Sequence, residues 1–438
     1  MNSEVNDMEN WQNNERAMQP IASARTLEQN HTAEATHSII LSGNGHTSAA
    51  VSGRTHSTGM RKILLVANTG WYLYNFRLPL ARLLRSRGVE VVMVCPDDPY
   101  VERLRAEGFR WVHYNLDRRS LNPFKELLGI FRLVLIYNRE RPSAVHHFTI
   151  KCVLYGSLAA KMAGIRAVVN AVTGLGYVFI DGSLSARLIR TMVKWLYRRV
   201  LTARRVRVVF QNPDDLQAFS DENMIVPDRT VLIRSSGVNL QRFCPRPGSP
   251  EVPPAPIVLF ASRLINEKGV AVLVEAARIL KRRCVNVTVQ IAGEPDKGNP
   301  SYISEATLEE WRREGAVDLL GHVDVIEDLI AMAAMVVLPS YREGIPHILL
   351  EAAAMGIPIV ATDVPGCREV VDHNVNGLLV PPKDPVALAD AIEKLLSNHE
   401  LCQKMGAAGR LKMQLEFDDQ IVAQRTIEVY NTTLAYVP

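Results

Sequence analysis

The chain has 438 residues, which is more than one small domain holds, so two domains of similar size are expected. Hydrophobic residues make up 47% of it and charged residues 22%, a balance typical of globular proteins with a sizeable core. The net charge of +4 is too small to indicate a nucleic-acid-binding protein by itself. The six cysteines form no CxxC pair, which argues against a zinc site or a disulfide framework.

Residues 1–59 are rich in Asn, Ser, Thr, His and Gly and show no periodicity, so we expect a disordered leader. The start of the chain lacks a signal-peptide pattern, and no apolar run is long enough to span a bilayer. The folded part is predicted to begin with a buried strand at 62–67, a helix at 76–87 and a second strand at 89–95. This βαβ order predicts a parallel sheet.

The alternation continues through "SAVHHFTIK", "RAVVNAVTGLG" and "RVRVVFQN". Ligands bind at the carboxyl ends of the strands in open parallel sheets. We therefore expect a ligand-binding loop site made by residues at or just after these ends, namely Asn68, Gly70, His146, His147, Lys151, Thr173 and Gly174.

A proline-rich stretch at 244–256 interrupts the alternation and is interpreted as an interdomain linker. Strand and helix patterns then resume. The sequence thus predicts an α/β protein with two Rossmann-like domains, at 60–243 and 257–415, and a ligand cleft between them.

The stretch "YREGIPHILLEAAAMG" carries two acids, Glu343 in a loop after a strand and Glu351 two turns into a helix whose first turn holds Pro346. The helix dipole and free backbone N–H groups near Gly344 and Ile345 favour an anion there. A phosphate could rest in this crevice while the carboxylates accept hydrogen bonds from sugar or ribose hydroxyls. The alternative is an ordinary loop acid and a solvated helix acid.

The stretch "ASRLINEKG" places Arg263 and Lys268 just after another strand. Two cations at a strand end are suited to neutralise a diphosphate, whose charge grows as a glycosyl bond breaks. The alternative is a pair of solvated loop cations.

Together "SRLINEKG", "PSYREGIPHILLEAAAMGIPIVATDVPGCREVV" and "NGLLVPP" resemble the family-four retaining glycosyltransferases, which have the GT-B fold and a Glu-x7-Glu motif; the resemblance covers roughly residues 60–434. It implies that Arg263 and Lys268 bind the donor diphosphate. Glu343 would contact the donor sugar beside the backbone of 344–346, and Glu351 would hold the ribose. Gly366 and Glu369 match a further corner of the family pattern, and residues 416–438 are expected to form a helix that packs back on the N-terminal domain.

The N-terminal half departs from the family pattern. Many members carry a His-x-His, but this chain has His146 at the first position and Phe148 at the second, which leaves His147 unplaced. Whether His146 or His147 acts in the site stays open, and His147 is kept beside Glu343, Arg263 and Lys268 in the expected catalytic set. The stretches "NTGWYLYNFR" and "TGLGYVF" resemble a subgroup that glycosylates polyprenyl-diphosphate-linked sugars in bacterial surface-polysaccharide assembly.

The resemblance implies a nucleotide-sugar substrate and no cofactor. A UDP-linked hexose or N-acetylhexosamine is favoured by family frequency, and the linkage and acceptor stay open. No Asp-x-Asp occurs in the chain, so we expect metal independence, with cations and a helix N-terminus at the diphosphate. No residue is a convincing covalent nucleophile, which favours same-face attack with Glu343 as a positioning group. A UDP-sugar epimerase of the same fold and a non-catalytic nucleotide-sugar-binding protein are the alternatives.

The stretch at 185–209 spaces Arg187, Arg190, Lys194, Arg198 and Arg199 at helical intervals. Leu188, Met192, Trp195, Leu196 and Val200 lie between them. A basic helix of this kind can lie on an anionic bilayer, and the alternative is a core helix with a solvated basic side. No RNA-binding motif accompanies it, so no nucleic-acid partner is expected. We expect a cytoplasmic protein, peripheral on the inner face of the cytoplasmic membrane.

Overall fold

The computed structural model describes residues 60–116, 122–172, 184–246 and 255–436, with the side chains of 184–189 left out. The expected leader at 1–59 lies outside the described residues, as do Thr173 and Gly174.

The N-terminal half forms a seven-stranded parallel sheet in the order β3-β2-β1-β4-β5-β6-β7. Each strand is short and apolar, and a helix follows most of them, as a doubly wound sheet requires. The strands are β1 (Lys62–Val66), β2 (Glu90–Cys95), β3 (Arg110–His113), β4 (Ala144–Phe148), β5 (Val168–Val172), β6 (Val206–Phe210) and β7 (Thr230–Leu232). The helices are α1 (Gly70–Ser86), α2 (Tyr100–Ala106), α3 (Pro123–Glu140), α4 (Ile150–Met162), α5 (Leu184–Leu201) and α6 (Pro213–Asp221).

The C-terminal half repeats this design with six parallel strands in the order β10-β9-β8-β11-β12-β13. The strands are β8 (Ile257–Ala261), β9 (Thr288–Ala292), β10 (Asp318–Gly321), β11 (Ala333–Leu338), β12 (Ile359–Thr362) and β13 (Gly377–Val380). The helices are α7 (Val270–Arg282), α8 (Glu305–Glu314), α9 (Ile326–Met332), α10 (His347–Ala354), α11 (Cys367–Val370), α12 (Pro385–Leu396) and α13 (His399–Lys412). The expected two parallel α/β sheets are thereby confirmed.

The strand order reverses between β1 and β4 in the first sheet and between β8 and β11 in the second. Ligands of open α/β sheets bind outside the carboxyl ends of the strands at such a reversal. Each sheet therefore offers one crevice. The loops after β1 and β4 line the first, and the loops after β8 and β11 line the second.

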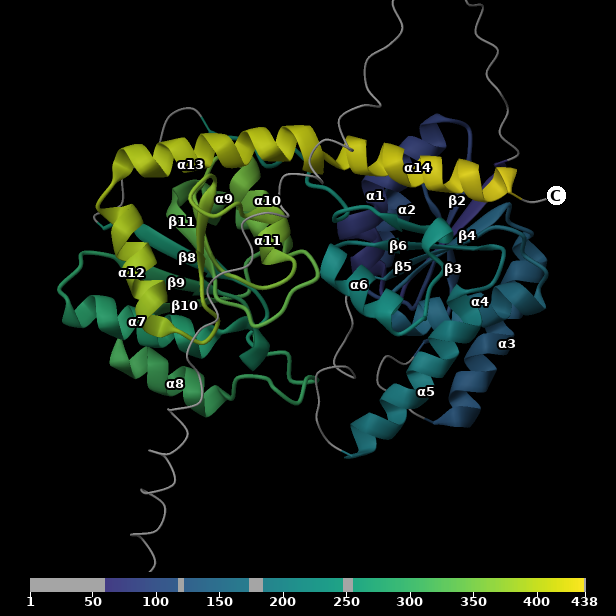
Figure 1. Cartoon of the computed structure of the whole chain (residues 1–438), viewed down its shortest axis with the longest axis horizontal. Coiled ribbons are helices and arrows are strands. Elements are labelled where there is room, and N and C mark those ends of the chain that lie inside the picture. Colours follow the sequence, from purple (N-terminus) through teal and green to yellow (C-terminus); the bar gives the residue numbers. More distant parts are fainter. Residues whose placement is uncertain (1–59, 117–121, 173–183, 247–254, 437–438) are drawn as a thin grey trace, which may run out of the picture. The chain divides into compact units, whose positions relative to one another are not determined.

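The last helix, α14 (Asp419–Ala435), packs against α1 and completes one of the two cores of the N-terminal sheet. Its Val422, Ile427 and Tyr430 are buried among side chains of α1, α2 and the strands. Helices α3, α4 and α5 cover the opposite face of the sheet, as Figure 1 shows. The seven-stranded sheet therefore depends on a helix that comes last in the chain.

Two expectations about helix ends need correction. Helix α1 begins at Gly70, six residues before the expected start at Phe76, because Thr69 Oγ1 accepts the N–H of Tyr72 at 3.1 Å. The carboxylate of Asp98, far along the chain, also accepts the N–H of Gly70 at 2.7 Å and so satisfies another free donor at this helix start.

The basic stretch at 185–209 is not one helix. Helix α5 ends at Leu201, and residues 206–210 form the buried strand β6. The residues "RVRVVF" alternate between polar and apolar, which is the pattern of a strand, and β6 pairs with β5 on one side and β7 on the other. The helix therefore ends before this segment. None of the described helices is long and apolar enough to cross a membrane.

Gly156 is predicted to be irreplaceable in α4, although alanine normally stabilises a helix over glycine. A Cβ at Gly156 would lie 2.5 Å from ring atoms of His147 on β4. We expect Gly156→Ala to lower the free energy of unfolding by about 1–3 kcal/mol, as overpacking does.

The matched control is Gly129→Ala in α3, where the nearest atom to a new Cβ is Tyr114 Oη at an ordinary 3.5 Å. This variant is expected to be neutral or more stable by up to about 1 kcal/mol. Urea unfolding of both variants checks the pair, and equal losses would contradict the packing argument.

Candidate active site

The crevice of the second sheet forms where the loops after β8 and β11 meet. These two strands pair directly, so their following loops start side by side. Gly269 lies at φ +71°, and a Cβ there would come 2.0 Å from the carbonyl oxygen of Pro339. Tyr341 N–H also donates to the carbonyl of Glu267 at 2.8 Å. The absence of a side chain at Gly269 lets the two loops touch, and this contact brings their charged residues together.

Lys268 and Glu343, both predicted from the sequence, form an ion pair across these loops. Lys268 Nζ lies 2.5 Å from Glu343 Oε1, and Ser340 Oγ donates to the same oxygen at 2.6 Å. The Glu343 side chain is only 8% exposed. A carboxylate that receives two such bonds is held in one orientation, which suits a positioning role better than that of a free nucleophile.

Gly366 fixes the other side of the Glu343 loop. It lies at φ +81°, and a Cβ would meet the carbonyl oxygen of Gly344 at 2.2 Å. Three residues on, Glu369 lies 2.7 Å from Arg234 Nε, although these atoms are not aligned for a hydrogen bond. Burial raises the pKa of Glu369 and the charge of Arg234 opposes this. Gly366 thus lies at the predicted corner, whereas Glu369 pairs with an arginine outside it.

Arg263 follows β8, as expected, and lies at the rim of the crevice. Its Nη1 is 2.7 Å from Asp296 Oδ2, and its side chain is mostly exposed. An exposed ion pair of this kind contributes little to stability, so Asp296 is replaceable as a partner. Arg263 can turn toward an anionic ligand at small energetic cost.

Glu351 lies in the second turn of α10 and lines a cavity. Burial raises the pKa of Glu351 to about 7, the charge of Arg242 opposes this, and Glu327 adds to it. Arg242 is itself held by Glu327 through two hydrogen bonds of 3.0 and 2.9 Å. No described residue donates a hydrogen bond to the Glu351 carboxylate, so a ligand hydroxyl would find a free acceptor there.

This cavity has a volume of about 420 Å³, which is in the range of small-molecule sites. Arg263, Lys268, Pro346 and Glu351 line it, so four of the predicted donor-site residues share one cavity. Residues that the sequence analysis did not single out complete its wall, among them Trp71, Phe76, Ser236, Asn239, Arg242, His347 and Asp419.

His347, the first residue of α10, connects this cavity to the N-terminal domain. Its ring packs on Phe76 of α1 with centroids 4.3 Å apart, and its Nε2 lies 3.0 Å from Ser236 Oγ. Burial and the nearby charge of Arg77 lower the pKa of His347 to about 3. A neutral imidazole in this position can accept or donate a hydrogen bond without adding charge to the cavity.

The two histidines of β4 have different surroundings. His147 is fully buried, with Nδ1 bound to Asn170 Oδ1 at 2.8 Å and Nε2 to Tyr137 Oη at 2.9 Å. Burial lowers its pKa to about 4. Both ring nitrogens have protein partners, and His147 does not line the cavity that holds Lys268 and Glu351.

His146 has one nitrogen without a partner. Its Nδ1 binds Tyr430 Oη of α14 at 2.6 Å, and its Nε2 is buried and unbonded. The ring packs on Phe148 with centroids 4.0 Å apart. Burial lowers the pKa of His146 well below its usual value, and the nearby Arg77 and His147 add to this. Of the two histidines, only His146 retains an unused hydrogen-bonding atom.

Of the remaining predicted N-terminal residues, Asn68 and Gly70 lie at the crevice of the first sheet and Lys151 is held in an ion pair. Gly70 lies under Asp98, and a Cβ at Gly70 would meet Asp98 Oδ1 at 2.5 Å. Asn68 is half-buried in the turn between β1 and α1. Lys151 pairs with Glu126 at 2.9 Å, both on the α3–α4 side of the sheet. Asn68 and Gly70 therefore lie at the expected reversal of strand order, whereas Lys151 is engaged by an acid.

Among the described residues, no three His, Cys, Asp or Glu side chains gather as they do around a metal ion.

Comparison with known proteins supplies the family. Residues 246–412 match the profile "Glycosyl transferases group 1", and residues 62–206 match "Glycosyl transferase 4-like". An N,N'-diacetylbacillosaminyl-diphospho-undecaprenol alpha-1,3-N-acetylgalactosaminyltransferase of Campylobacter jejuni is 31% identical over 86% of this chain and its own full length. The chain is a family-four glycosyltransferase.

Two further similarities fit this family. The capsular polysaccharide biosynthesis glycosyltransferase CapM of Staphylococcus aureus is 22% identical over 82% of this chain and 94% of its own. The crystal structure of Anabaena HepE in complex with UDP and glucose aligns with a TM-score of 0.69 and 20% identity, and the alignment covers 84% of this glycosyltransferase and 98% of that chain. The latter match shows the GT-B fold alone.

Sequence reasoning missed the wall residues of this glycosyltransferase for a physical reason. Arg242 lies in the segment after β7, where no strand or helix period marks it, and Asp419 is the first residue of α14, whose helical pattern does not indicate a contact with the cavity. His347 stands inside the quoted Glu343–Glu351 stretch, and its place as the first helical residue after Pro346 was the one available signal.

Glu351 makes a prediction about pH. Its pKa is raised in the folded state from 4.5 to about 7, so the folded protein holds a proton there that the unfolded chain has released. Its contribution to stability is present below about pH 4.5 and is lost as the pH rises through 7. We expect the wild type to lose about 2–3 kcal/mol more than Glu351→Gln between pH 5 and pH 8.

Chemical unfolding at the two pH values checks this difference. Glu310→Gln, which removes an exposed acid of α8, is the matched control and should follow the wild type. Parallel pH profiles for the wild type and Glu351→Gln would contradict the raised pKa.

Proposed function

We propose that this glycosyltransferase moves a hexose or N-acetylhexosamine from a UDP-sugar to a polyprenyl-diphosphate-linked acceptor in bacterial surface-polysaccharide synthesis. The observation that carries the proposal is the Lys268–Glu343 ion pair at the strand-order reversal, beside a cavity that Arg263 and Glu351 also line. The activity of the Campylobacter relative supports the lipid-linked acceptor, and the UDP and glucose bound to HepE support the donor.

Arg263 and Lys268 are the proposed ligands of the donor diphosphate. Arg263 is free to leave Asp296, and Lys268 would share its charge between Glu343 and a phosphate oxygen. As the bond between the sugar C1 and the phosphate oxygen breaks, its electron pair moves onto the diphosphate. Two cations in a partly buried crevice stabilise that charge more strongly than water does.

Glu343 is proposed to orient the donor sugar, with Gly344, Ile345 and Pro346 beside it. Glu351 is proposed to accept hydrogen bonds from the ribose hydroxyls, which would offset its burial and favour its ionised form. Gly366 supports the Glu343 loop by its close approach to Gly344. Glu369 would act only through Arg234.

The proposed reaction retains the configuration at C1. The acceptor hydroxyl oxygen forms its bond to C1 on the face that the diphosphate leaves, and the hydroxyl proton passes to the departing phosphate oxygen. Glu343 is too firmly bound by Lys268 and Ser340 to serve as the nucleophile of a covalent intermediate. On the acceptor side we propose Asn68, Gly70 and His146, since His147 is fully engaged inside the domain.

A nucleotide-release assay tests the donor, the acceptor and the metal requirement together. UDP release from a panel of UDP-sugars should depend on a polyprenyl-diphosphate-linked sugar and should continue unchanged in EDTA. Glu343→Gln should lower turnover by about 10²–10³-fold, as the loss of a preorganised charged contact does, and Glu310→Gln should not.

Sugar conversion without acceptor would instead indicate an epimerase, and donor binding without turnover would indicate a binding protein. Loss of activity in EDTA would contradict metal independence. A glycosyl adduct trapped on Glu343 would contradict the same-face mechanism.

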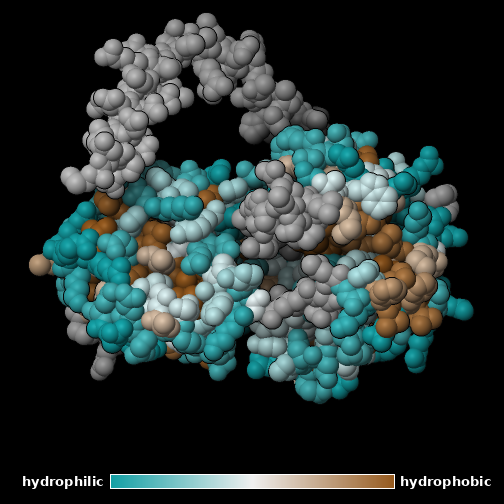
Figure 2. Space-filling model, turned by 90° about the horizontal axis from the view of Figure 1, so that it is seen from below, coloured by the Kyte–Doolittle hydropathy of each residue, from teal (hydrophilic) through white to brown (hydrophobic). Residues whose placement is uncertain are grey.

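We also propose that the enzyme is peripheral on the inner face of the cytoplasmic membrane. Helix α3 exposes five large apolar side chains in helical spacing: Phe124, Leu127, Leu128, Phe131 and Leu135. Figure 2 shows hydrophobic side chains gathered over the part of the surface that α3 forms. An exposed apolar stripe of this length needs a partner surface.

The charges of α3 favour an anionic bilayer as that partner. Lys125, Arg132 and Arg139 are exposed on the helix, whereas its acids Glu126 and Glu140 are engaged by cations. Helix α5 adds exposed Met192 and Trp195. Lys194 and Arg198 of this helix were expected on its basic surface. Lys194 pairs with the carboxylate of Glu222, and Arg198 donates to the Glu222 backbone carbonyl.

Vesicle co-sedimentation tests the α3 stripe. Leu128→Glu/Phe131→Glu places two acids in it and should reduce binding to phosphatidylcholine vesicles containing phosphatidylglycerol by at least about tenfold, because each acid opposes both apolar insertion and attraction to anionic lipid. Val375→Glu/Val386→Glu makes the same change at exposed positions of the C-terminal domain and should bind like the wild type. An equal loss in both variants would contradict a membrane role for α3.

A further inference from the structure

A second cavity, of about 550 Å³, opens between α4 and α5 beside the first residues of β5 and β6. Its wall is apolar: Leu158 from α4, Ile165, Val168 from β5, and Leu196 and Val200 from α5. None of these residues lines the cavity that holds Glu351. The two cavities are therefore separate: this one is lined by residues of the N-terminal half alone, and the one that holds Glu351 by residues of both halves.

Four cations surround the opening of this apolar cavity: Lys161, Arg199, Arg204 and Arg205. All four are exposed, and no acid of the described residues pairs with any of them. Lys194, on the same helix as Arg199, pairs with the carboxylate of Glu222, whereas Arg198 donates only to the Glu222 backbone carbonyl, so α5 carries both paired and unpaired cations. An uncompensated group of cations attracts a multiply charged anion.

Trp195 also lines the cavity and extends to its outside. Its side chain is 55% exposed, and the Arg199 guanidinium lies over its ring at 5.4 Å. Tryptophan and arginine together are typical of the boundary between a bilayer and water, because each has an apolar body and a polar end. The opening of the cavity therefore lies on the same surface as exposed Met192 of α5.

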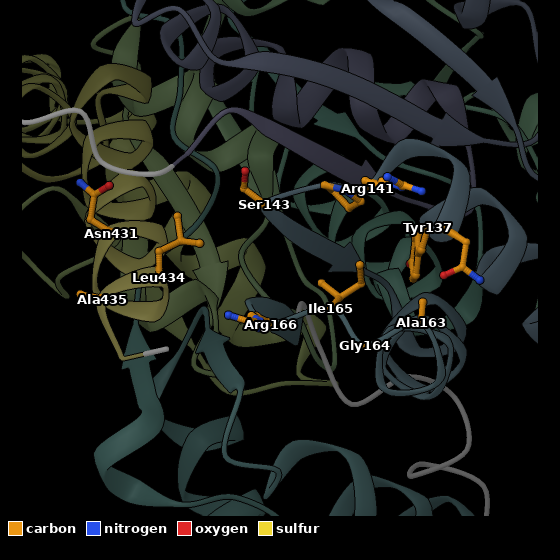
Figure 3. A pocket seen from close by; sticks show the side chains of 12 residues that line it. Tyr137, Arg141, Ser143, Ala163, Gly164, Ile165, Arg166, Asn431, Leu434 and Ala435 are labelled. Carbon is orange, nitrogen blue, oxygen red and sulfur yellow. The ribbon is translucent and has the colours of Figure 1, made fainter. Parts of the chain in front are cut away.

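Neighbouring cavities extend the positive charge along the amino ends of the strands. One of them, of about 610 Å³, shares Arg204 and Arg205 and adds Arg207 and Arg229. Another, of about 760 Å³, shares Ile165 and is lined by Arg141 and Arg166; Figure 3 shows it between α14 and the ends of α3 and α4. Asp228 is the one acid among the residues that line these three cavities.

An apolar wall and a cationic rim together fit an amphiphile with a phosphate head and an apolar chain. Inorganic phosphate would leave the wall unused, and a neutral lipid would leave the rim unused. The acceptor's own diphosphate does not fit this place during the reaction. The cavity lies at the amino ends of β5 and β6, and each of these strands has five residues. The amino ends therefore lie about 15 Å from the carboxyl ends, where the proposed reaction takes place.

We propose that this cavity binds one anionic phospholipid of the bilayer, with its phosphate between Arg199, Arg204 and Arg205 and one chain against Leu158 and Val200. The inference rests on the proposed membrane attachment and adds a specific lipid site to it. Bound there, a lipid would hold α5 at the membrane surface while the carboxyl edge of the sheet stays open to substrate.

Calorimetric titration with dihexanoyl phosphatidylglycerol, kept below its micelle concentration, tests the site apart from any vesicle surface. The wild type should bind one molecule per chain, at least tenfold more tightly than dihexanoyl phosphatidylcholine. Arg204→Gln/Arg205→Gln should weaken binding by at least tenfold by removing rim charge. Ala203→Phe should do the same by filling the cavity while leaving every cation in place.

The matched control is Arg313→Gln/Lys404→Gln, which removes two exposed, unpaired cations of the C-terminal domain and should bind as the wild type does. UDP release in detergent solution should be equal in all four proteins, which shows that the variants fold. If the wild type releases no UDP, the proposed reaction fails, and the titration still decides the lipid site.

Three results would overturn the lipid site. They are the absence of saturable binding, an Ala203→Phe variant that binds like the wild type, and tighter binding of geranyl diphosphate in competition with the phosphatidylglycerol. The second result would mean that the lipid is attracted only to the charged surface of the protein and does not enter the cavity. The third would assign the cavity to an isoprenoid diphosphate.

Discussion

The two segments that connect the sheets are hydrogen-bonded to each other, and the candidate active site depends on that contact. Val238 donates to the carbonyl of Phe417 at 2.8 Å, and Asp419 donates to the carbonyl of Val238 at 3.1 Å. The approach is so close that a Cβ at Gly237 would meet Asp419 Cα at 2.4 Å. Residues 236–239 and Asp419 form part of the cavity wall, so any hinge motion of the enzyme must bend both segments together.

The charges of the site are paired before any ligand arrives. Lys268 is held by Glu343, Arg263 by Asp296 and Arg242 by Glu327, while Glu351 has a raised pKa and receives no hydrogen bond from the described residues. A diphosphate would compete with the acids for the first two cations. Preorganised cations cost little to reorient at the moment of reaction, which is the condition for electrostatic stabilisation of a leaving group.

The parts of this structure that follow from local pattern could be predicted from the sequence. Apolar runs ending in polar residues predicted the parallel sheets, and Lys268 and Glu343 were each predicted to follow a strand. Contacts between distant segments could not be predicted in this way. Asp98 at the start of α1 has no local signal, and neither has the engagement of His147 by Tyr137 and Asn170. The basic stretch after Leu184 was misjudged because its helix and strand share one run of cations.

The dependence of the N-terminal sheet on α14 has a consequence for biosynthesis. Val422, Ile427 and Tyr430 complete a core whose other members come from α1, α2 and the strands, more than 180 residues earlier for every strand of that sheet. A ribosome finishes this sheet's sequence long before it makes the helix that covers it. The nascent domain therefore exposes the apolar side of α1 until synthesis is nearly complete, a state in which chaperones would find it.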